Sequence, residues 1–450
     1  MARRFLSSRV ALAVAVSAGL GAVALPVPAS AKAKPEVSKI TFSPAFAKAA
    51  AELDKAVSES SKNAAVTAAA EKVRAAATPA AKQAAQAEVD AALGGAQAKL
   101  AAAAAVATTP GDKLKLGEIT RNVGVLFSDP AQQHTGLVSM IDSGVLAPEQ
   151  LGQVQFLAGV TAYQYGDYAG AIQYIKPSFD SGYRDQGGLI ERVLADSYKR
   201  TNNNAAALEL AQRNLAAARA AGTKPSEEAI RVALQAAYDA KNVASSADLC
   251  AELARNYPTT KSWTSALGVV RQLAALPAQE NLDLMRLMFR TGAMTEKRDY
   301  FEYIENVDPR RQPGEALKVM DAGVASGKVT SAEVAEYRQI ANGRLAADKA
   351  SLASLERDAH SATAPMNTIT AAADAFLGYG QPVKAEELYK IALAKPGADK
   401  DRAFMRIGIA QVDQGKYADA KQSFGQVTGN RLSVAKVWIA YVDTKAAPAT

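Results

Sequence analysis

The side chains that most often carry out chemistry in proteins are few and scattered in this 450-residue sequence. There is one cysteine, Cys250, and there are two histidines, His134 and His360. A single cysteine excludes a disulfide framework, and no Cys/His group has the spacing of a usual metal site. Composition alone leaves catalysis by serine, aspartate or glutamate open.

The surroundings of these three residues indicate structural roles. His134 stands in a polar segment that reads as a loop, and His360 stands in a segment rich in Ser and Thr before Pro365. Both are therefore predicted to be surface histidines. Cys250 lies on an apolar helical segment, where a cysteine behaves as a small core residue rather than as a reactive thiol.

Adjacent carboxylates offer a second source of chemistry. The pairs Glu227-Glu228 and Glu386-Glu387 both fall where a helix is predicted to begin, and acids there favour the positive end of the helix dipole. Helix capping is thus the predicted role of both pairs. The sequence also has no phosphate-binding glycine loop and no calcium loop. We therefore predict a protein that is not an enzyme and that uses neither a cofactor nor a metal.

The N-terminus has the pattern of an export signal. Three arginines precede an apolar run at 10–25, and the small residues Ala29 and Ala31 follow it. The run is shorter than the roughly 20 residues of a membrane-spanning helix. We predict a signal peptide at 1–31, a mature chain that begins at Lys32, and a soluble product in the periplasm of a Gram-negative bacterium.

Charge and hydropathy limit the classes of partner. The predicted signal peptide contains three arginines and no acid, so its removal lowers the formal net charge from +7 to +4. Such a small excess spread over the whole chain is weak evidence for a polyanion, and we predict no nucleic-acid partner. No later segment is apolar enough to span a membrane, and no small-molecule substrate is expected.

The first part of the mature chain, residues 32–111, is dominated by alanine, the best helix former. Breaks near 58–61, 78–79 and 108–111 divide it into two or three predicted helices. Alanine removes little apolar area from water, so these helices are predicted to be weakly packed. The region is either a helical extension or a segment that packs on a partner.

Beyond residue 112, apolar residues recur at i, i+3, i+4 and i+7 in segments of about 12 to 16 residues. Short breaks of Gly, Asn or Pro separate these segments, which is typical of antiparallel helix hairpins. The predicted fold class is therefore all-α.

One set of residue types occurs twice, at positions 249 apart. The first copy is Gly159, Gly166, Tyr168 and Ala171. The second copy is Gly408, Gly415, Tyr417 and Ala420. A related set precedes the second copy by 35 residues, the length of one helix hairpin, and consists of Gly380, Ala385 and Tyr389.

Each residue type in this set has a physical role. Small residues on both helices, such as Gly408 and Ala420, allow the two backbones to approach to about 8–10 Å. The glycines between the helices mark turns through positive φ, and Asn202 and Asn242 are predicted to replace them elsewhere. Aromatic residues such as Phe424 fill the space between successive hairpins.

This pattern resembles the tetratricopeptide repeat. The resemblance is specific at 401–428, good at 366–397 and 152–180, weaker around 194–258, and lost at 261–360. It implies an α-solenoid, a right-handed superhelix with one concave face. We divide the mature chain into the Ala-rich region, degenerate repeats at 112–360, C-terminal repeats with a capping helix at 361–443, and a disordered tail at 444–450.

The resemblance also implies which positions face the groove. In one repeat these are Phe156, Val160, Tyr163 and Gln164, and in the next they are Arg192, Asp196, Lys199 and Arg200. An aromatic patch beside a basic one suits an extended peptide with apolar and acidic side chains. The predicted protein-binding residues are Phe156, Tyr163, Arg192, Lys199 and Arg200.

Exported bacterial proteins with such repeats are mostly scaffolds, so we expect a platform that binds peptides or other envelope proteins. The alternative is a role in handling polysaccharide, as a periplasmic adaptor of an export system or as the helical part of a glycan-cleaving enzyme. Cleavage would need paired carboxylates in a compact cleft, and no non-repeat region of suitable size remains apart from the Ala-rich N-terminus.

Overall fold

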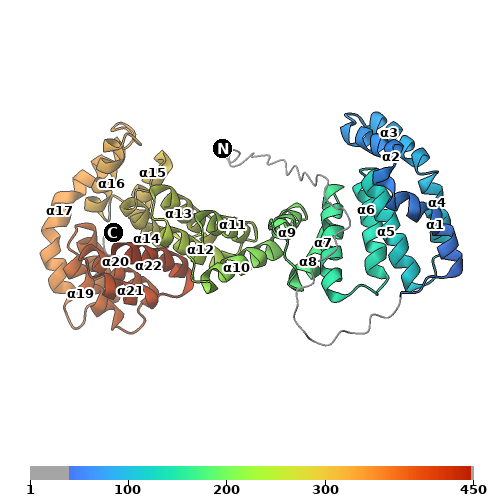
Figure 1. Cartoon of the computed structure of the whole chain (residues 1–450). Coiled ribbons are helices and arrows are strands. Elements are labelled where there is room, and N and C mark those ends of the chain that lie inside the picture. The colour runs from blue at the N-terminus through green and yellow to red at the C-terminus, as the bar shows by residue number, and fades with distance from the viewer. Residues whose placement is uncertain (1–39, 447–450) are drawn as a thin grey trace.

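The computed structural model describes residues 40–446, and its regular structure is entirely helical (Figure 1). This range contains 22 α-helices and two 3-10 helices but no β-strand, which confirms the all-α class. No helix in this range combines the length and apolar character needed to cross a bilayer. The predicted signal peptide at 1–31, with its cleavage site before Lys32, lies outside the described residues.

The Ala-rich region forms four helices rather than two or three. They are α1 (Pro44–Ser58), α2 (Ala64–Ala75), α3 (Pro79–Ala92) and α4 (Ala96–Val106). The three predicted breaks are present. The fourth comes from Gly94 and Gly95, whose positive φ angles of 70° and 80° end α3 and redirect the chain.

These helices share a core with α5 (Pro110–Leu126). Phe46, Leu53 and Val89 are buried together with Ile119 and Val123 of α5. The prediction of weak packing is therefore wrong, because a few large side chains among the alanines supply the buried area. The predicted boundary at 111 is also wrong, since it falls inside α5.

A buried carboxylate ties the start of the described chain to α5. Asp112 accepts hydrogen bonds from the backbone N and Oγ of Ser43, at 2.9 and 2.8 Å, and from the backbone N of Thr108 and Thr109. Burial alone would raise the pKa of Asp112, but these hydrogen bonds hold it well below its usual value.

Replacing Asp112 by alanine is therefore expected to lower the free energy of local opening at residues 40–58 by about 2–3 kcal/mol. Because the pKa is depressed in the folded state, this stabilisation is present above the unfolded pKa of about 3.9 and is lost as pH falls through the folded value. Native-state hydrogen exchange near neutral pH measures the opening. An unchanged exchange rate in α1 would contradict the role of Asp112.

The remaining helices follow as hairpins with short connections. The middle of the chain contains α6 (Pro130–Asp142), α7 (Pro148–Gln164), α8 (Tyr168–Asp180), α9 (Leu189–Arg200), α10 (Asn204–Ala220), α11 (Glu227–Asp239), α12 (Val243–Asn256) and α13 (Thr260–Ala274). The last part contains α14 (Ala278–Arg290), α15 (Lys297–Val307), α16 (Pro313–Ala325), α17 (Ala335–Ala359), α18 (Met366–Gly378), α19 (Pro382–Leu393), α20 (Lys400–Asp413), α21 (Tyr417–Gly425) and α22 (Leu432–Ala446).

The small residues of the repeated set stand where helices meet closely, as predicted. A Cβ atom added to Gly159 on α7 would lie 2.2 Å from Cγ1 of Ile175 on α8. One added to Gly408 on α20 would lie 2.6 Å from the Phe424 ring on α21. Ala171 and Ala420 are fully buried. Side chains larger than hydrogen would therefore separate each hairpin.

The turn prediction is confirmed at four positions and wrong at one. Positive φ angles occur at Gly166, Gly380, Gly415 and Asn202. At the fifth turn, Lys241 takes the positive φ of 53°, and Asn242 instead caps α12 by accepting from the backbone N of Ser245. The difference arises because an asparagine carbonyl accepts the hydrogen bond of a helix start, which a lysine cannot do.

Side-chain hydrogen bonds recur between residues 31 to 34 apart. These pairs include Tyr163 with Asp196, Arg219 with Glu252, Arg231 with Ser265, Arg271 with Glu302, and Tyr337 with Glu305. They link each hairpin to the next. The same spacing continues through 261–360, where the sequence signature is lost.

The C-terminal helix packs back on earlier helices instead of extending the array (Figure 1). On α22, Trp438 donates to the backbone oxygen of Asp283 at 3.0 Å, and Asp443 pairs with Arg255 of α12 at 2.7 Å. One buried core consequently runs from Leu208 to Val442. The predicted division at 360 does not separate two cores.

The predicted tail at 444–450 is also corrected in part. α22 continues through Ala446, so residues 444–446 are helical, while residues 447–450 lie outside the described range.

Candidate functional site

The predicted groove residues lie on α7 and α9, and three of them form one cluster. The Tyr163 hydroxyl donates to Oδ2 of Asp196 at 2.7 Å, and Arg200 pairs with the same carboxylate. The Arg200 guanidinium also lies 4.7 Å from the ring centre of Tyr168. Tyr163 and Arg200 thus join α7 to α9 in addition to reaching the surface.

The prediction that Phe156 is a contact residue is wrong. Phe156 is 8% exposed and Val160 is 6% exposed, and both belong to the core beneath α7. The connection between α8 and α9 places Tyr183 against Phe156, with ring centres 5.4 Å apart. The repeat pattern assumes a short turn between hairpins. It does not predict that Tyr183 covers Phe156, because the connection here is longer and spans residues 181–188.

The accessible part of the predicted surface is basic. Arg192 and Lys199 are exposed, and neither forms an ion pair with another of the described residues. Gln164 is also exposed at the end of α7. A partner that meets this face would therefore find two cations available for its acidic groups.

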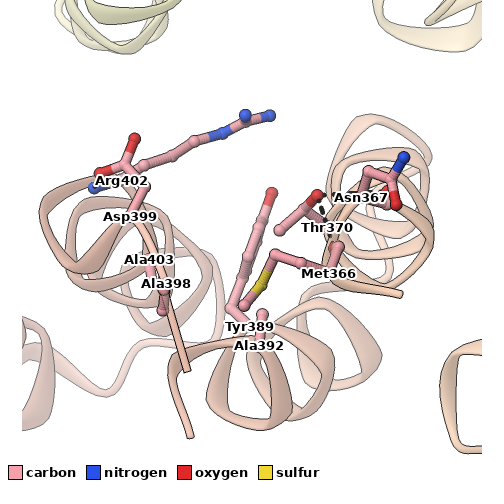
Figure 2. Close-up of a pocket in the computed structure, with 10 residues that line it drawn as sticks. Met366, Asn367, Thr370, Tyr389, Ala392, Ala398, Asp399, Arg402 and Ala403 are labelled. Carbon is pink, nitrogen blue, oxygen red and sulfur yellow. Dashed lines mark hydrogen bonds between the residues drawn. The ribbon is translucent and has the colours of Figure 1, made fainter. Parts of the chain in front are cut away.

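A cavity of about 370 Å³ lies between α18, α19 and α20, in repeats for which the sequence predicted packing but no binding site (Figure 2). Apolar groups line its floor: Met366, Tyr389, Ala392 and Ala403. Polar side chains surround them: Asn367, Thr370, Asp399 and Arg402. An apolar base with a few polar groups is typical of a ligand-binding cavity.

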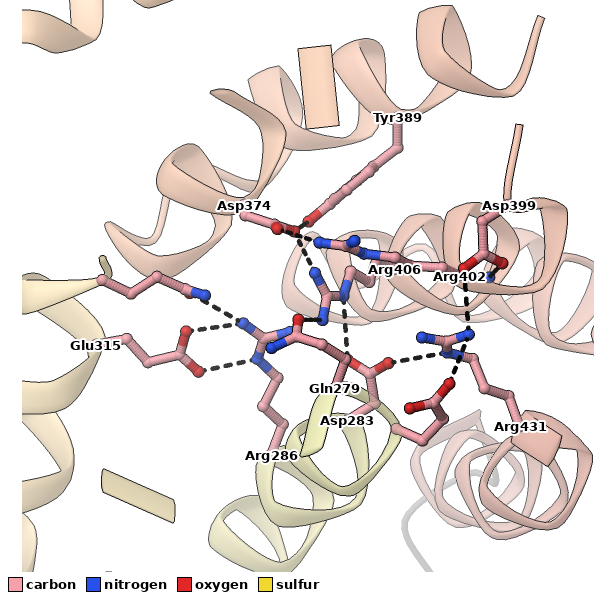
Figure 3. Close-up of polar contacts among 12 residues, drawn as sticks. Gln279, Asp283, Arg286, Glu315, Asp374, Tyr389, Asp399, Arg402, Arg406 and Arg431 are labelled. Atoms are coloured by element: carbon pink, nitrogen blue, oxygen red, sulfur yellow. Dashed lines mark hydrogen bonds and ion pairs between the residues drawn. The ribbon is translucent and has the colours of Figure 1, made fainter. Parts of the chain in front are cut away.

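A buried ion network lies beside this cavity (Figure 3). Asp374 accepts hydrogen bonds from the Tyr389 hydroxyl, from Arg402 Nη2 at 2.6 Å and from Arg406 Nη1. Arg406 continues to Oδ1 of Asp283 on α14 at 3.2 Å. The network therefore connects the wall of the cavity to a helix more than 100 residues earlier in the chain.

A second arginine extends the network to α16. Arg286 makes a two-pronged pair with Glu315, with both distances 2.8 Å, and also contacts Asp283 at 3.1 Å. Burial alone would raise the pKa of Glu315, but Arg286 and the Tyr303 hydroxyl lower it. Arg406 and Arg402 lower the pKa of Asp374 in the same way. Both carboxylates are therefore charged at neutral pH.

Sequence reasoning missed this network, although a signal was present. Asp283 and Arg286 interrupt the apolar run of α14, and Arg406 stands between buried residues of α20. A charged residue on the apolar side of a helix needs a buried partner. The sequence does not show which partner, because the paired residues lie far apart.

The carboxylate pairs behave differently from one another. Glu227 and Glu228 occupy the first turn of α11, as predicted. Glu386 does not cap α19, which begins at Pro382; it is buried and accepts hydrogen bonds from Gln411, Gln414, Lys390 and Lys416. Burial alone would raise its pKa, but these partners lower it to about 2.

The cysteine and the histidines have structural surroundings. Cys250 is fully buried, as predicted, and burial raises the pKa of its thiol. His360 is exposed, as predicted. His134 lies in α6 rather than in a loop; it is half-buried, its Nδ1 is 2.8 Å from the Ala158 oxygen, and its ring contacts Tyr174. Within residues 40–446, no group of three or more His, Cys, Asp or Glu side chains is placed to hold a metal ion.

Comparison with known proteins yields no family for this chain, since no family model and no curated protein matches it. The functional interpretation therefore depends on the exposed cations of α9 and on the cavity between α18 and α20.

Proposed function

We propose that this chain is a non-catalytic scaffold of tetratricopeptide-like repeats that binds peptides or other proteins of the bacterial cell envelope. Two features support a solenoid of such repeats. Hairpins pack closely at Gly159 and Gly408, and side-chain bonds 31 to 34 residues apart join successive hairpins. A stack of this kind presents a long surface for partners.

One observation carries the binding role: Arg192 and Lys199 on α9 are exposed, and neither forms an ion pair with a residue at 40–446. The neighbouring Arg200 is held by Asp196 and lies over Tyr168, so the surface next to them is ordered. An ordered basic face favours an extended partner segment that carries acidic side chains. The export signal predicted at 1–31 favours a location in the periplasm, where such partners would be envelope proteins.

Reversing both charges, with Arg192→Glu and Lys199→Glu, is expected to reduce partner capture by roughly tenfold. The mature protein is used as bait in proximity labelling and in pull-downs from envelope extract. Its far-UV circular dichroism spectrum should remain helical, because both side chains are exposed.

A matched control carries Arg310→Glu and Lys328→Glu, which reverse two exposed cations in another part of the chain. This control should capture the same partners as the native protein. Identical capture by all three proteins would show that α9 is not the binding face. Recovery of glycan in place of protein would instead favour the polysaccharide-export role.

A further inference from the structure

The cavity between α18, α19 and α20 contains hydrogen-bond donors that have no acceptor among the described residues. Its acceptors are engaged: Oδ1 of Asp399 accepts from the backbone N of Arg402 at 2.9 Å, and Oδ2 lies 3.4 Å from Nη1 of Arg431. On the opposite wall, Oδ1 of Asn367 accepts from the backbone N of Thr368 at 3.1 Å. Each of these three oxygen atoms thus has at least one donor.

The donors of the cavity are not all engaged. Arg402 holds Asp374 through Nη2 alone, and its Nε is buried without an acceptor among the described residues. No hydrogen bond links Arg402 Nη1 or Asn367 Nδ2 to another described residue. The Nε atom is closed to a ligand because it is buried, but a ligand that carries acceptors can form a hydrogen bond with Arg402 Nη1.

Asp374, which lies beneath the cavity, holds the Arg402 side chain in position. Asp374 accepts from Arg402, from Arg406 and from Tyr389, whose ring forms part of the floor. Arg406 is itself shared between Asp374 and Asp283. Arg402 therefore contributes to balancing Asp374 through Nη2, and its Nη1 is left for a further acceptor. The Arg402 side chain is 27% exposed, so a ligand in the cavity has access to it.

The apolar residues that line the cavity determine the size and character of the part of the ligand that does not contact Arg402. Tyr389, Ala392, Ala403 and Met366 present a ring, two methyl groups and a thioether. The volume of about 370 Å³ is near the lower end of the roughly 300–1,000 Å³ range of ligand pockets. This favours an apolar group of the size of one amino-acid side chain over a long hydrocarbon.

The geometry points to a binding site for a carboxylate borne on a small apolar group. The guanidinium of Arg402 binds the carboxylate, and the apolar group lies on Tyr389 and Met366, which line the same cavity (Figure 2). Two sources provide this chemistry, a free small carboxylic acid and the C-terminal residue of a protein chain. The site lies apart from α9 and does not depend on the scaffold role.

Isothermal titration calorimetry on the mature chain tests the site with three probes. They are N-acetyl-leucine, its neutral analogue N-acetyl-leucinamide, and a short peptide that ends in leucine with a free carboxylate. The acid is expected to bind at least about tenfold more tightly than the amide, because only the acid forms a charge-assisted bond with Arg402. Much tighter binding of the peptide would identify a chain terminus as the source, and equal binding would identify the small acid.

Three variants locate the binding. Arg402→Gln should weaken acid binding about tenfold or more, and Thr370→Trp should block the cavity without touching Arg402. Lys400→Gln removes an exposed cation from the same helix end and should leave binding unchanged. Circular dichroism checks that each variant is folded.

The proposal is overturned if the acid and the amide bind equally, if none of the probes binds, or if Lys400→Gln weakens binding as much as Arg402→Gln. The variant with Arg192→Glu and Lys199→Glu should bind the acid normally. Failure of the scaffold role and failure of the carboxylate site therefore give different results.

Discussion

Replacing Arg406 by methionine will lower the free energy of unfolding of the C-terminal helices by about 3–5 kcal/mol. Arg406 is fully buried and contacts Asp283 on α14, Asp374 on α18 and Gln279. The methionine would leave two carboxylates in the interior without their shared cation. An uncompensated buried charge is among the most destabilising changes in a folded protein.

Urea unfolding followed by far-UV circular dichroism measures this change. A matched control is Lys421→Met, which removes a cation from an exposed ion pair with Asp443 and should cost less than about 1 kcal/mol. Adding Asp283→Asn and Asp374→Asn to Arg406→Met should restore part of the stability, because the buried negative charges are removed. Equal losses for Arg406→Met and Lys421→Met would show that the network does not hold α14 and α20 together.

Replacing Ala420 by tyrosine will destabilise the same region by about 1–3 kcal/mol. Ala420 is fully buried on α21, which packs so closely on α20 that Gly408 has no room for a Cβ atom beside Phe424. A tyrosine at this position must push the two helices apart. Phe424 stacks on Trp438 of α22, with ring centres 5.5 Å apart, so the displacement would extend to the C-terminal helix.

Ala418→Tyr is the matched control, because Ala418 lies on the same helix with its side chain exposed. Its effect should be within about 0.5 kcal/mol of zero. Differential scanning calorimetry compares the two variants. A melting curve of Ala420→Tyr that coincides with that of Ala418→Tyr would contradict close packing between α20 and α21.

Local features of the hairpins follow from the sequence because each depends on a few neighbouring residues. Gly166 and Gly415 adopt positive φ where turns were expected, and the alanines at 171 and 420 are buried at helix contacts. The exchange of roles between Lys241 and Asn242 is an error of one residue within a turn of the right kind. Such features are set by backbone sterics and helix periodicity.

The exposure of the residues in the proposed binding face was predicted only in part. The resemblance to the tetratricopeptide repeat placed Arg192 and Lys199 on one side of a helix, and both are exposed on α9. It also placed Phe156 at the surface, which is wrong because Tyr183 covers it from a connection whose course the spacing does not specify. The exposure of a residue depends on which segments pack over its helix, and some of those segments are not neighbours in the sequence.

The sequence by itself determined the all-α class, the hairpins of the repeated set with their close helix contacts, and the buried position of Cys250, because these depend on side-chain size, backbone freedom and helical period within short stretches. The tertiary structure alone decided that α22 returns to α12, that Asp283 meets Arg406, and that α18, α19 and α20 enclose a cavity. Those contacts join residues far apart in the chain. Their energy comes from burial and from the pairing of charges in the interior, and neither depends on spacing along the sequence.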